Sequence, residues 1–285
     1  MSHYLFADHR AIHRRSLRRI VKLVGVLIVA LAVAPLLTRM GPGVRVTTAP
    51  DIGGRSAAWP AAVTSSAPTS VAKGFEPRTV GRSVQGRPIK MWSFGTGSRR
   101  VLLIGGIHGN EYGSGLASRL VAYFTAHPSA VPHGSKIDIV PCANPDGTAA
   151  HRRTNAHGVD INRNFPVAWS IHGARSGESP GVRPASEPET RVIMALLHEG
   201  RYCRAIALHS AGGLVDYDGP GGARLASRIA RAARSRVVHL ATLRTYTGSL
   251  GRYAPARYAI PTITWELQSA SLGPHVIAGV QAAAR

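Results

Sequence analysis

The chain contains few acidic residues, few lysines and few cysteines. Its 285 residues include 14 aspartates and glutamates against 35 lysines and arginines, so the formal charge is +21, and only four of the basic residues are lysines. This shortage of acids predicts a surface that attracts anions such as nucleic acid, phospholipid headgroups, anionic polymers or an acidic substrate. Hydrophobic residues make up 44% of the sequence and the mean hydropathy is near zero, which excludes a disordered polyelectrolyte and a polytopic membrane protein.

The first 40 residues place positive charge next to an apolar run. They contain seven basic residues and one acid, and Lys22 precedes the uncharged segment Leu23–Leu37, an order typical of an export signal. This run of 15 residues is shorter than the roughly 20 that a spanning helix needs, so a cleaved signal and an uncleaved anchor both remain open. Pro35, directly after Ala32-Val33-Ala34, disfavours cleavage and favours the anchor. We therefore predict an extracytoplasmic protein, either membrane-anchored by an N-terminal helix or secreted.

Composition divides the rest of the chain in two. Residues 41–74 are rich in Gly, Pro, Ala, Ser and Thr without periodicity, which predicts a flexible linker. Residues 75–285 alternate short apolar runs with helical patterns, which predicts a single α/β domain with a mixed, mostly parallel twisted sheet and helices on both faces. The expected strands are Val101–Ile107, Ile137–Val140, Ala205–Leu208 and Thr262–Leu267, and the expected helices are Glu111–Thr125, Ser186–His198, one from about Ala223 and one near the C-terminus.

The two cysteines are expected to be free. An extracytoplasmic location would allow a disulfide. However, Cys142 follows one predicted strand and Cys203 precedes another. In parallel strands these positions lie at opposite ends of the sheet, too far apart to bridge.

Polar residues at the ends of three predicted strands point to a metal site. His108 and Glu111 lie three residues apart in the turn after the first strand, and His209 follows a second strand. Two histidines and one carboxylate are a ligand set of catalytic zinc sites, which leave a fourth position open. Glu266 lies near the end of a third strand among apolar neighbours. Burying a carboxylate there is costly, which indicates a functional role.

Five motifs in order carry a family resemblance. They are HGNE from His108, NPDG from Asn144, RTNxxGVDINRNF from Arg153, LHS ending at Ser210 and TWEL from Thr264. Together they resemble the zinc metallocarboxypeptidases over about Val80 to Gln268, and most resemble their short bacterial branch, the murein peptide amidases. The segment Gly81–Ile89 is also similar to the opening hairpin of that branch.

The resemblance implies roles for residues around one Zn²⁺ per chain. His108, Glu111 and His209 would bind the metal, and Asp160 would accept the distal N–H of a ligand imidazole. Glu266 would take a proton from the attacking water and return one to the leaving amine.

The same resemblance implies how the substrate is held. Arg153, which fits the motif spacing better than Arg152, would stabilise the oxyanion. Asn162 and Arg163 would clamp the terminal carboxylate. Tyr246, with Tyr253 as the alternative, would close over the substrate. Leu250 would line the side-chain pocket, and an apolar residue there argues against simple Lys/Arg specificity.

These roles predict an exported zinc peptidase that cleaves the amide bond to a residue with a free carboxylate. The expected substrate is a peptidoglycan stem peptide or a general peptide C-terminus. Two alternatives are the related zinc-dependent N-acyl amino acid deacylases and, less favoured, a non-catalytic basic protein that binds the cell wall. No nucleic-acid partner is expected, because no binding motif is present.

Two further patterns have competing interpretations. Asp216 and Asp218 could recognise a cationic group such as the ammonium of diaminopimelate, but a turn built on Asp-Gly is favoured. Arginines at positions 224, 228, 231 and 234 fall on one helix face. A solvated face is favoured there over binding to an anionic cell-wall polymer or to membrane headgroups.

Overall fold

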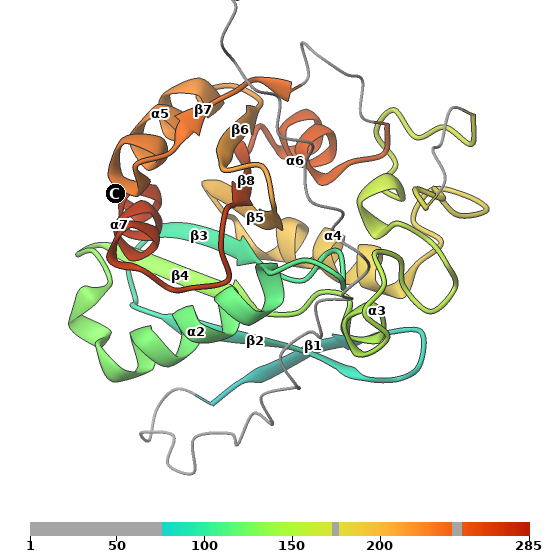
Figure 1. Cartoon of the computed structure of the whole chain (residues 1–285), viewed down its shortest axis with the longest axis horizontal. Helices are drawn as coiled ribbons and strands as arrows, with labels where there is room; N and C mark the ends of the chain where they lie inside the picture. The colour runs from blue at the N-terminus through green and yellow to red at the C-terminus, as the bar shows by residue number, and fades with distance from the viewer. Residues whose placement is uncertain (1–75, 173–176, 241–246) are drawn as a thin grey trace, which may run out of the picture. The chain divides into compact units, whose positions relative to one another are not determined.

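The computed structural model of the chain describes residues 76–172, 177–240 and 247–285 (Figure 1). The predicted signal or anchor, the predicted linker and Tyr246 lie outside these residues and stay predictions. Within the described ranges, no helix combines the length and the apolar character needed to cross a bilayer.

The described chain forms one mixed sheet of eight strands in the order β1-β2-β4-β3-β5-β8-β6-β7. The four central strands β4, β3, β5 and β8 run parallel, while β2 and β6 flank them in antiparallel orientation. This arrangement confirms the predicted mostly parallel sheet. The strands are β1 (Arg78–Arg82), β2 (Pro88–Phe94), β3 (Arg99–Ile104), β4 (Ser135–Val140), β5 (Arg204–Ser210), β6 (Leu214–Asp218), β7 (Arg236–Val237) and β8 (Thr262–Leu267).

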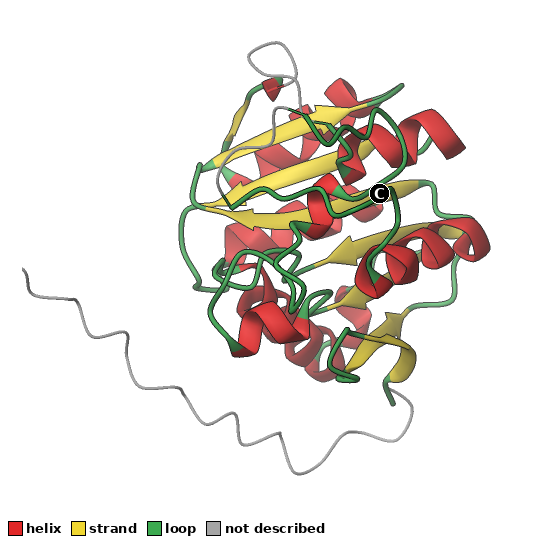
Figure 2. Ribbon diagram, turned by 90° about the vertical axis from the view of Figure 1, so that its right-hand side faces the viewer, coloured by secondary structure: helices red, strands yellow, loops and turns green. Residues whose placement is uncertain are grey.

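Helices cover both faces of the sheet, as predicted (Figure 2). The cause is visible in β3, where Val101 and Leu103 belong to one buried cluster while Leu102 and Ile104 belong to the other. A strand that is apolar on both faces must be covered on both faces. One cluster includes α2 (Gly113–Ala126), α5 (Gly222–Ala233) and α7 (Pro274–Ala284), and the other includes α4 (Pro188–Gly200) and α6 (Leu250–Tyr258).

Short helical segments follow two of the predicted motifs. Helix α3 (Pro145–Ala149) starts in NPDG, with Asn144 as its N-cap, and the 3-10 helix η3 (Ile161–Arg163) lies in the long motif with Asp160 as its N-cap. A second 3-10 helix, η2 (Pro128–Ala130), follows α2.

The two cysteines are free, as expected. Cys142 follows β4 and Cys203 precedes β5, and both strands run parallel to β3 between them.

The structure corrects the interpretation of Asp216 and Asp218 as a turn. Both residues lie in β6, which pairs with β8 so that Asp216 faces Thr264 and Asp218 faces Thr262. The chain turns one residue later, at Gly219, whose φ of +80° suits glycine. The pairing of β6 with β8 therefore decides the structure of this segment. Local residue preferences do not predict such a pairing.

Candidate active site

The carboxyl ends of β3, β5 and β8 bring the predicted site residues to one edge of the sheet. His209 pairs directly with Glu266 in the register of β5 and β8. His108 and Glu111 lie in the turn that connects β3 to α2. Ligand sites of parallel sheets occupy this edge, because the loops that leave the strands converge there.

Two glycines allow the loops to approach each other closely. Gly109 packs so tightly on α3 that an added Cβ would lie 2.0 Å from the carbonyl carbon of Gly147. Gly106 has a φ of +61°, which lets the chain turn sharply after β3. The HGNE and NPDG motifs are thus in contact through backbone atoms.

The three predicted metal ligands converge. His108 Nδ1 lies 2.7 Å from Glu111 Oε1, His209 Nδ1 lies 2.9 Å from Glu111 Oε2, and the two Nδ1 atoms are 3.1 Å apart. Ligand atoms about 2.0 Å from a tetrahedral zinc ion would be separated by about 3.3 Å, close to these distances. The histidines are only 3% and 2% exposed. The buried donor set therefore fits Zn²⁺.

Asp160 and Arg153 surround the ligands with hydrogen bonds. The Nε2 atom of His108 lies 3.0 Å from Asp160 Oδ1, on the opposite side of the ring from the ligand nitrogen. Arg153 donates to Asp160 Oδ2 through Nε at 2.9 Å and its Nη2 lies 2.8 Å from the same oxygen, while its Nη1 lies 3.5 Å from Glu111. Arg152 is exposed instead, so the structure brings Arg153, and not Arg152, to the site.

The electrostatics of this cluster favour a positive charge between the carboxylates. Burial lowers the pKa of His108, but Asp160 and Glu111 outweigh that effect and raise the pKa to about 9. Burial opposes ionisation of Glu111 and of Asp160, yet their hydrogen bonds and the neighbouring positive charges hold both pKa values well below the usual range. A metal ion bound here would replace the imidazole proton, since histidine binds metals in its neutral form.

Asn162 and Arg163 reach the pocket from η3. Asn162 Oδ1 accepts the backbone N–H of Leu250 at 2.9 Å, which ties η3 to the start of α6. Arg163 is 6% exposed and its Nε donates to Glu178 Oε2 at 3.3 Å. Glu178 is a pocket residue that the sequence analysis missed, because it lies in a loop without periodicity or a recognised motif.

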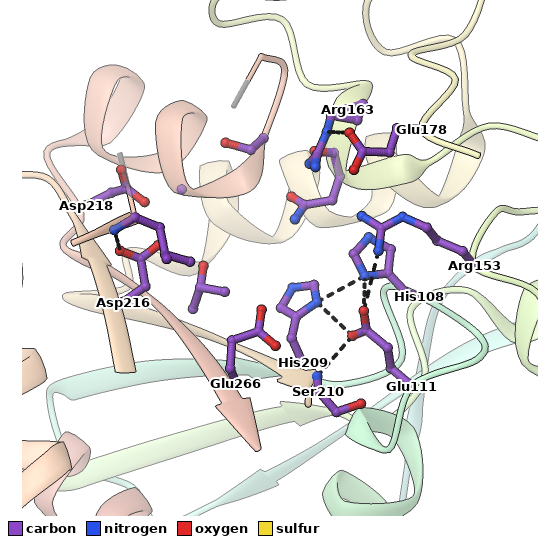
Figure 3. Close-up of a pocket in the computed structure, with 15 residues that line it drawn as sticks. His108, Glu111, Arg153, Arg163, Glu178, His209, Ser210, Asp216, Asp218 and Glu266 are labelled. Atoms are coloured by element: carbon purple, nitrogen blue, oxygen red, sulfur yellow. Dashed lines mark hydrogen bonds and ion pairs between the residues drawn. The ribbon is translucent and has the colours of Figure 1, made fainter. Parts of the chain in front are cut away.

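A pocket of about 220 Å³ connects these groups (Figure 3). Glu266 points into it and, within the described residues, has no hydrogen bond and no ion pair with another side chain. Its carboxylate is therefore available to a ligand. The lining residues are His108, Glu111, Arg153, Asn162, Arg163, Glu178, His209, Ser210, Asp216, Asp218, Leu240, Ser249, Gly251, Thr264 and Glu266.

The structure corrects the expectation for Leu250. Its side chain is 1% exposed and belongs to the buried cluster between the sheet, α4 and α6, while its neighbours Ser249 and Gly251 line the pocket. The first residue of α6 faces the core, which directs the side chain away from the site. Tyr253 is also buried, with its ring centroid 5.4 Å from that of Phe165, and does not line the pocket.

Asp216 and Asp218 line the pocket from β6. Asp216 is 6% exposed and accepts the backbone N–H of Leu240 at 2.8 Å. Burial, together with the nearby charge of Asp218, raises the pKa of Asp216 to about 6, and burial also raises the pKa of Asp218. Residues two apart in a strand point to the same face of a sheet. If this segment had been predicted as a strand, the sequence would have placed both aspartates on one face.

Comparisons with known proteins agree with this geometry. Residues 65–259 match the zinc carboxypeptidase family of metallopeptidases, which are hydrolases. Murein peptide amidase A of Escherichia coli K12 is 34% identical over 150 residues, a match that covers 47% of this chain and only 60% of the relative. The corresponding protein of Vibrio campbellii is 28% identical over 67% of this chain and 79% of its own length.

Solved structures give the same result. The murein-tripeptide amidase of Escherichia coli O157 superposes with a TM-score of 0.60 and 26% identity, over 75% of this chain and 96% of the relative. Bovine thrombin-activatable fibrinolysis inhibitor shares the fold, with a TM-score of 0.65 and 18% identity over 74% of this chain and 89% of that chain. Because the family match spans more than half of the sequence and includes the converging triad, the chain belongs to the zinc carboxypeptidase family.

Proposed function

We propose that this protein is an exported zinc peptidase that hydrolyses the amide bond to a residue with a free carboxylate, and that its substrate is a peptidoglycan stem peptide. The observation that carries the proposal is the convergence of the His108, Glu111 and His209 triad with Glu266, Arg153 and Arg163 on one pocket. The murein substrates named for the Escherichia coli and Vibrio relatives support the choice of substrate.

His108, Glu111 and His209 would hold one Zn²⁺. When bound, this ion would act as a Lewis acid toward the substrate carbonyl and would lower the pKa of a water molecule. Asp160 would keep the distal ring nitrogen of His108 protonated, so that the Nδ1 lone pair faces the metal.

Arg163 and Asn162 would orient the substrate by its terminal carboxylate. Guanidinium geometry suits a carboxylate, and Arg163 already contacts one, that of Glu178. A substrate carboxylate would share or replace this partner. Its binding would place the amide bond between the triad and Glu266.

Glu266 would move the protons of the reaction. Its carboxylate would take one proton from the attacking water, whose oxygen forms a bond to the carbonyl carbon. Arg153 would stabilise the negative charge that develops on the carbonyl oxygen. When the C–N bond breaks, Glu266 would return the proton to the departing nitrogen, so that the products are a carboxylate and an amine.

The N-terminal charge pattern supports export, with retention at the membrane by an uncleaved anchor. The arginines at and just after α5 support a role for an anionic cell-wall polymer in holding the enzyme near its substrate, since Arg224 and Arg231 in the helix and its C-cap Arg234 are exposed. Fractionation of cells that produce the full chain, with and without residues 1–40, tests the location. Recovery of the full chain in the cytoplasm would contradict export.

The activity is tested with the zinc-loaded full chain. Hydrolysis of a γ-D-glutamyl-diaminopimelate peptide is compared with that of ordinary dipeptides and of N-acetyl amino acids. Glu266→Gln should keep stoichiometric zinc, measured by mass spectrometry, and lose about 10²- to 10⁴-fold in kcat. Wild-type rates in this variant would refute the mechanism, and preference for N-acetyl amino acids would favour a deacylase.

A further inference from the structure

A cluster of arginines lies at the amino ends of the parallel strands, at the opposite edge of the sheet from the pocket. β3 starts at Arg99 and β5 starts at Arg204, and the register pairs Val101 with Arg204. Because side chains alternate along a strand, Arg99 lies on the same face as Val101, and Arg204 on the same face as Ile206. Val101 and Ile206 belong to the buried cluster that includes α5 and α7, so both arginine side chains leave the sheet on that face.

Helix α5 brings two more arginines to this edge. Arg224 and Arg228 lie about one turn apart on one helix face, and Arg228 is close enough to Arg204 for their charges to repel. Arg224 is exposed, whereas Arg228 is half-buried. The last turn of α7, which packs against α5, lies here as well, because Arg204 donates a hydrogen bond to the carbonyl of Ala283 (Figure 1). The elements β3, β5 and α5, which are far apart in the sequence, therefore bring arginines to one region.

No carboxylate compensates these charges within the described ranges. The ion pairs there between arginines and acids involve other arginines, not Arg99, Arg204, Arg224 or Arg228. Arg99 and Arg204 donate to backbone carbonyl groups, which carry no net charge. The Nε atom of Arg228 is buried and has no hydrogen-bond partner in the described chain. The protein therefore supplies positive charge here without a matching anion of its own.

The electrostatics of the cluster show that these positive charges are costly to one another. Burial lowers the pKa of Arg204, and the nearby charge of Arg99 also lowers it. Burial lowers the pKa of Arg228 as well, and the charges of Arg204 and Arg224 add to this effect. Like charges disfavour the charged form of each group. An anion bound among the guanidinium groups would offset this cost, since it attracts all of them at once.

We propose that Arg99, Arg204 and Arg228 bind a phosphate group, with Arg224 on its exposed side. A phosphate group has several oxygen atoms around a tetrahedral centre, and these accept hydrogen bonds from different directions. Guanidinium groups that come from three separate elements suit such an acceptor. A planar carboxylate is saturated by a single arginine in a bidentate pair and would leave the other charges uncompensated.

The phosphate site is separate from the catalytic pocket. None of its four arginines lines that pocket. Arg204 and His209 lie near opposite ends of β5, five residues apart, which corresponds to about 16–17 Å along the strand. A phosphate-bearing surface held at this edge would therefore leave the pocket open on the far side. The assignment does not depend on the proposed function, because it concerns binding away from the reacting groups.

The test is a calorimetric titration of the zinc-loaded full chain with inorganic phosphate at constant ionic strength. Phosphate also suits the guanidinium of Arg163 in the pocket, so all titrations use an Arg163→Gln background. The site variants are Arg204→Gln and Arg228→Gln. Arg82→Gln, which removes the same charge from an exposed residue of β1, is the matched control. Each site variant should weaken phosphate binding by about 10- to 100-fold, the effect of a lost charge-assisted hydrogen bond, while the control keeps the parent affinity.

Absence of phosphate binding, or equal affinity in both site variants and the control, would overturn the assignment. Acetate bound as tightly as phosphate would also overturn it. Arg204→Gln removes the bond to α7 as well; should that variant fail to fold, Arg228→Gln, whose Nε has no partner in the described chain, carries the test.

A parallel titration identifies the source of the phosphate. It uses glycerophosphoglycerol, which is the headgroup of phosphatidylglycerol without its acyl chains. Tighter binding of this diester than of inorganic phosphate supports a lipid headgroup as the ligand, and the reverse order supports soluble phosphate. Loss of either binding event in Arg228→Gln, with retention in Arg82→Gln, assigns it to the arginine cluster.

Discussion

Replacing Asp216 by Asn is expected to stabilise the protein above pH 6. The carboxylate is buried beside Asp218, and this environment raises its pKa from 3.8 to about 6. A difference of that size corresponds to about 3 kcal/mol of unfavourable free energy for the charged form at neutral pH. Asn has nearly the same shape and can still accept the N–H of Leu240, so it removes the charge without leaving a cavity.

An opposing effect reduces the gain. The bond from Leu240 to a carboxylate is stronger than the bond to a neutral amide oxygen, and the exchange costs about 1 kcal/mol. The net expectation is therefore about 2 kcal/mol, or a rise in Tm of about 4–8 °C for a domain of this size.

The sign of the effect depends on pH in a way that identifies its cause. Between pH 3.8 and 6 the folded state binds a proton on Asp216 more tightly than the unfolded state, so wild-type stability falls as pH rises through this window. Below about pH 3 both states are protonated, and at pH 4 the variant should already have lost most of its advantage. Thermal unfolding of wild type, Asp216→Asn and the exposed control Glu199→Gln at pH 4 and pH 7.5 measures this. A gain of equal size at both pH values, or a destabilised variant at pH 7.5, would refute the electrostatic reasoning.

Two further predictions concern the reaction. Asp160→Asn removes the negative charge and one of the two oxygens that accept from His108 and Arg153, so zinc affinity measured by chelator competition should fall by about 10- to 100-fold. Arg153→Ala should lower kcat by about 10²- to 10³-fold with a smaller change in KM, since the side chain is proposed to stabilise the developing oxyanion, and steady-state kinetics would contradict this if only KM changed.

Local sequence predicted the parts of the site that local structure controls. His108 and Glu111 lie in one tight turn, so their spacing alone brings both side chains to one point. His209 and Glu266 come from strands that are far apart in the sequence, yet both follow or end apolar runs, and the parallel arrangement of β5 and β8 makes them neighbours. The order of motifs was sufficient because parallel strands end at one edge.

The residues that were missed or misplaced depend on contacts between distant segments. Asp216 and Asp218 precede a glycine and resemble a turn, but the pairing of β6 with β8 extends the strand to Asp218. Leu250 follows the Gly-Ser pair as expected, yet the first turn of α6 directs it into the core between the sheet and α4. Glu178 contacts Arg163 through a loop that no periodicity predicts. Each of these positions is decided by tertiary packing, which outweighs local preference.

Because the chain has few acidic residues, the positions of those it has are informative. The pocket is lined by five carboxylates but only two guanidinium groups, the reverse of the charge balance in the chain as a whole. Glu178 is matched by Arg163, and Glu111 belongs to the triad that would hold a divalent ion. Among the described residues, no cation pairs with Glu266, the proposed proton-transfer group, or with Asp216 and Asp218. The other basic residues of the described chain lie outside this acidic cavity, on a surface that is proposed to hold the enzyme against anionic material. Neutralising the exposed arginines of α5 should therefore reduce binding to an anionic polymer without altering the rate of hydrolysis of free peptides.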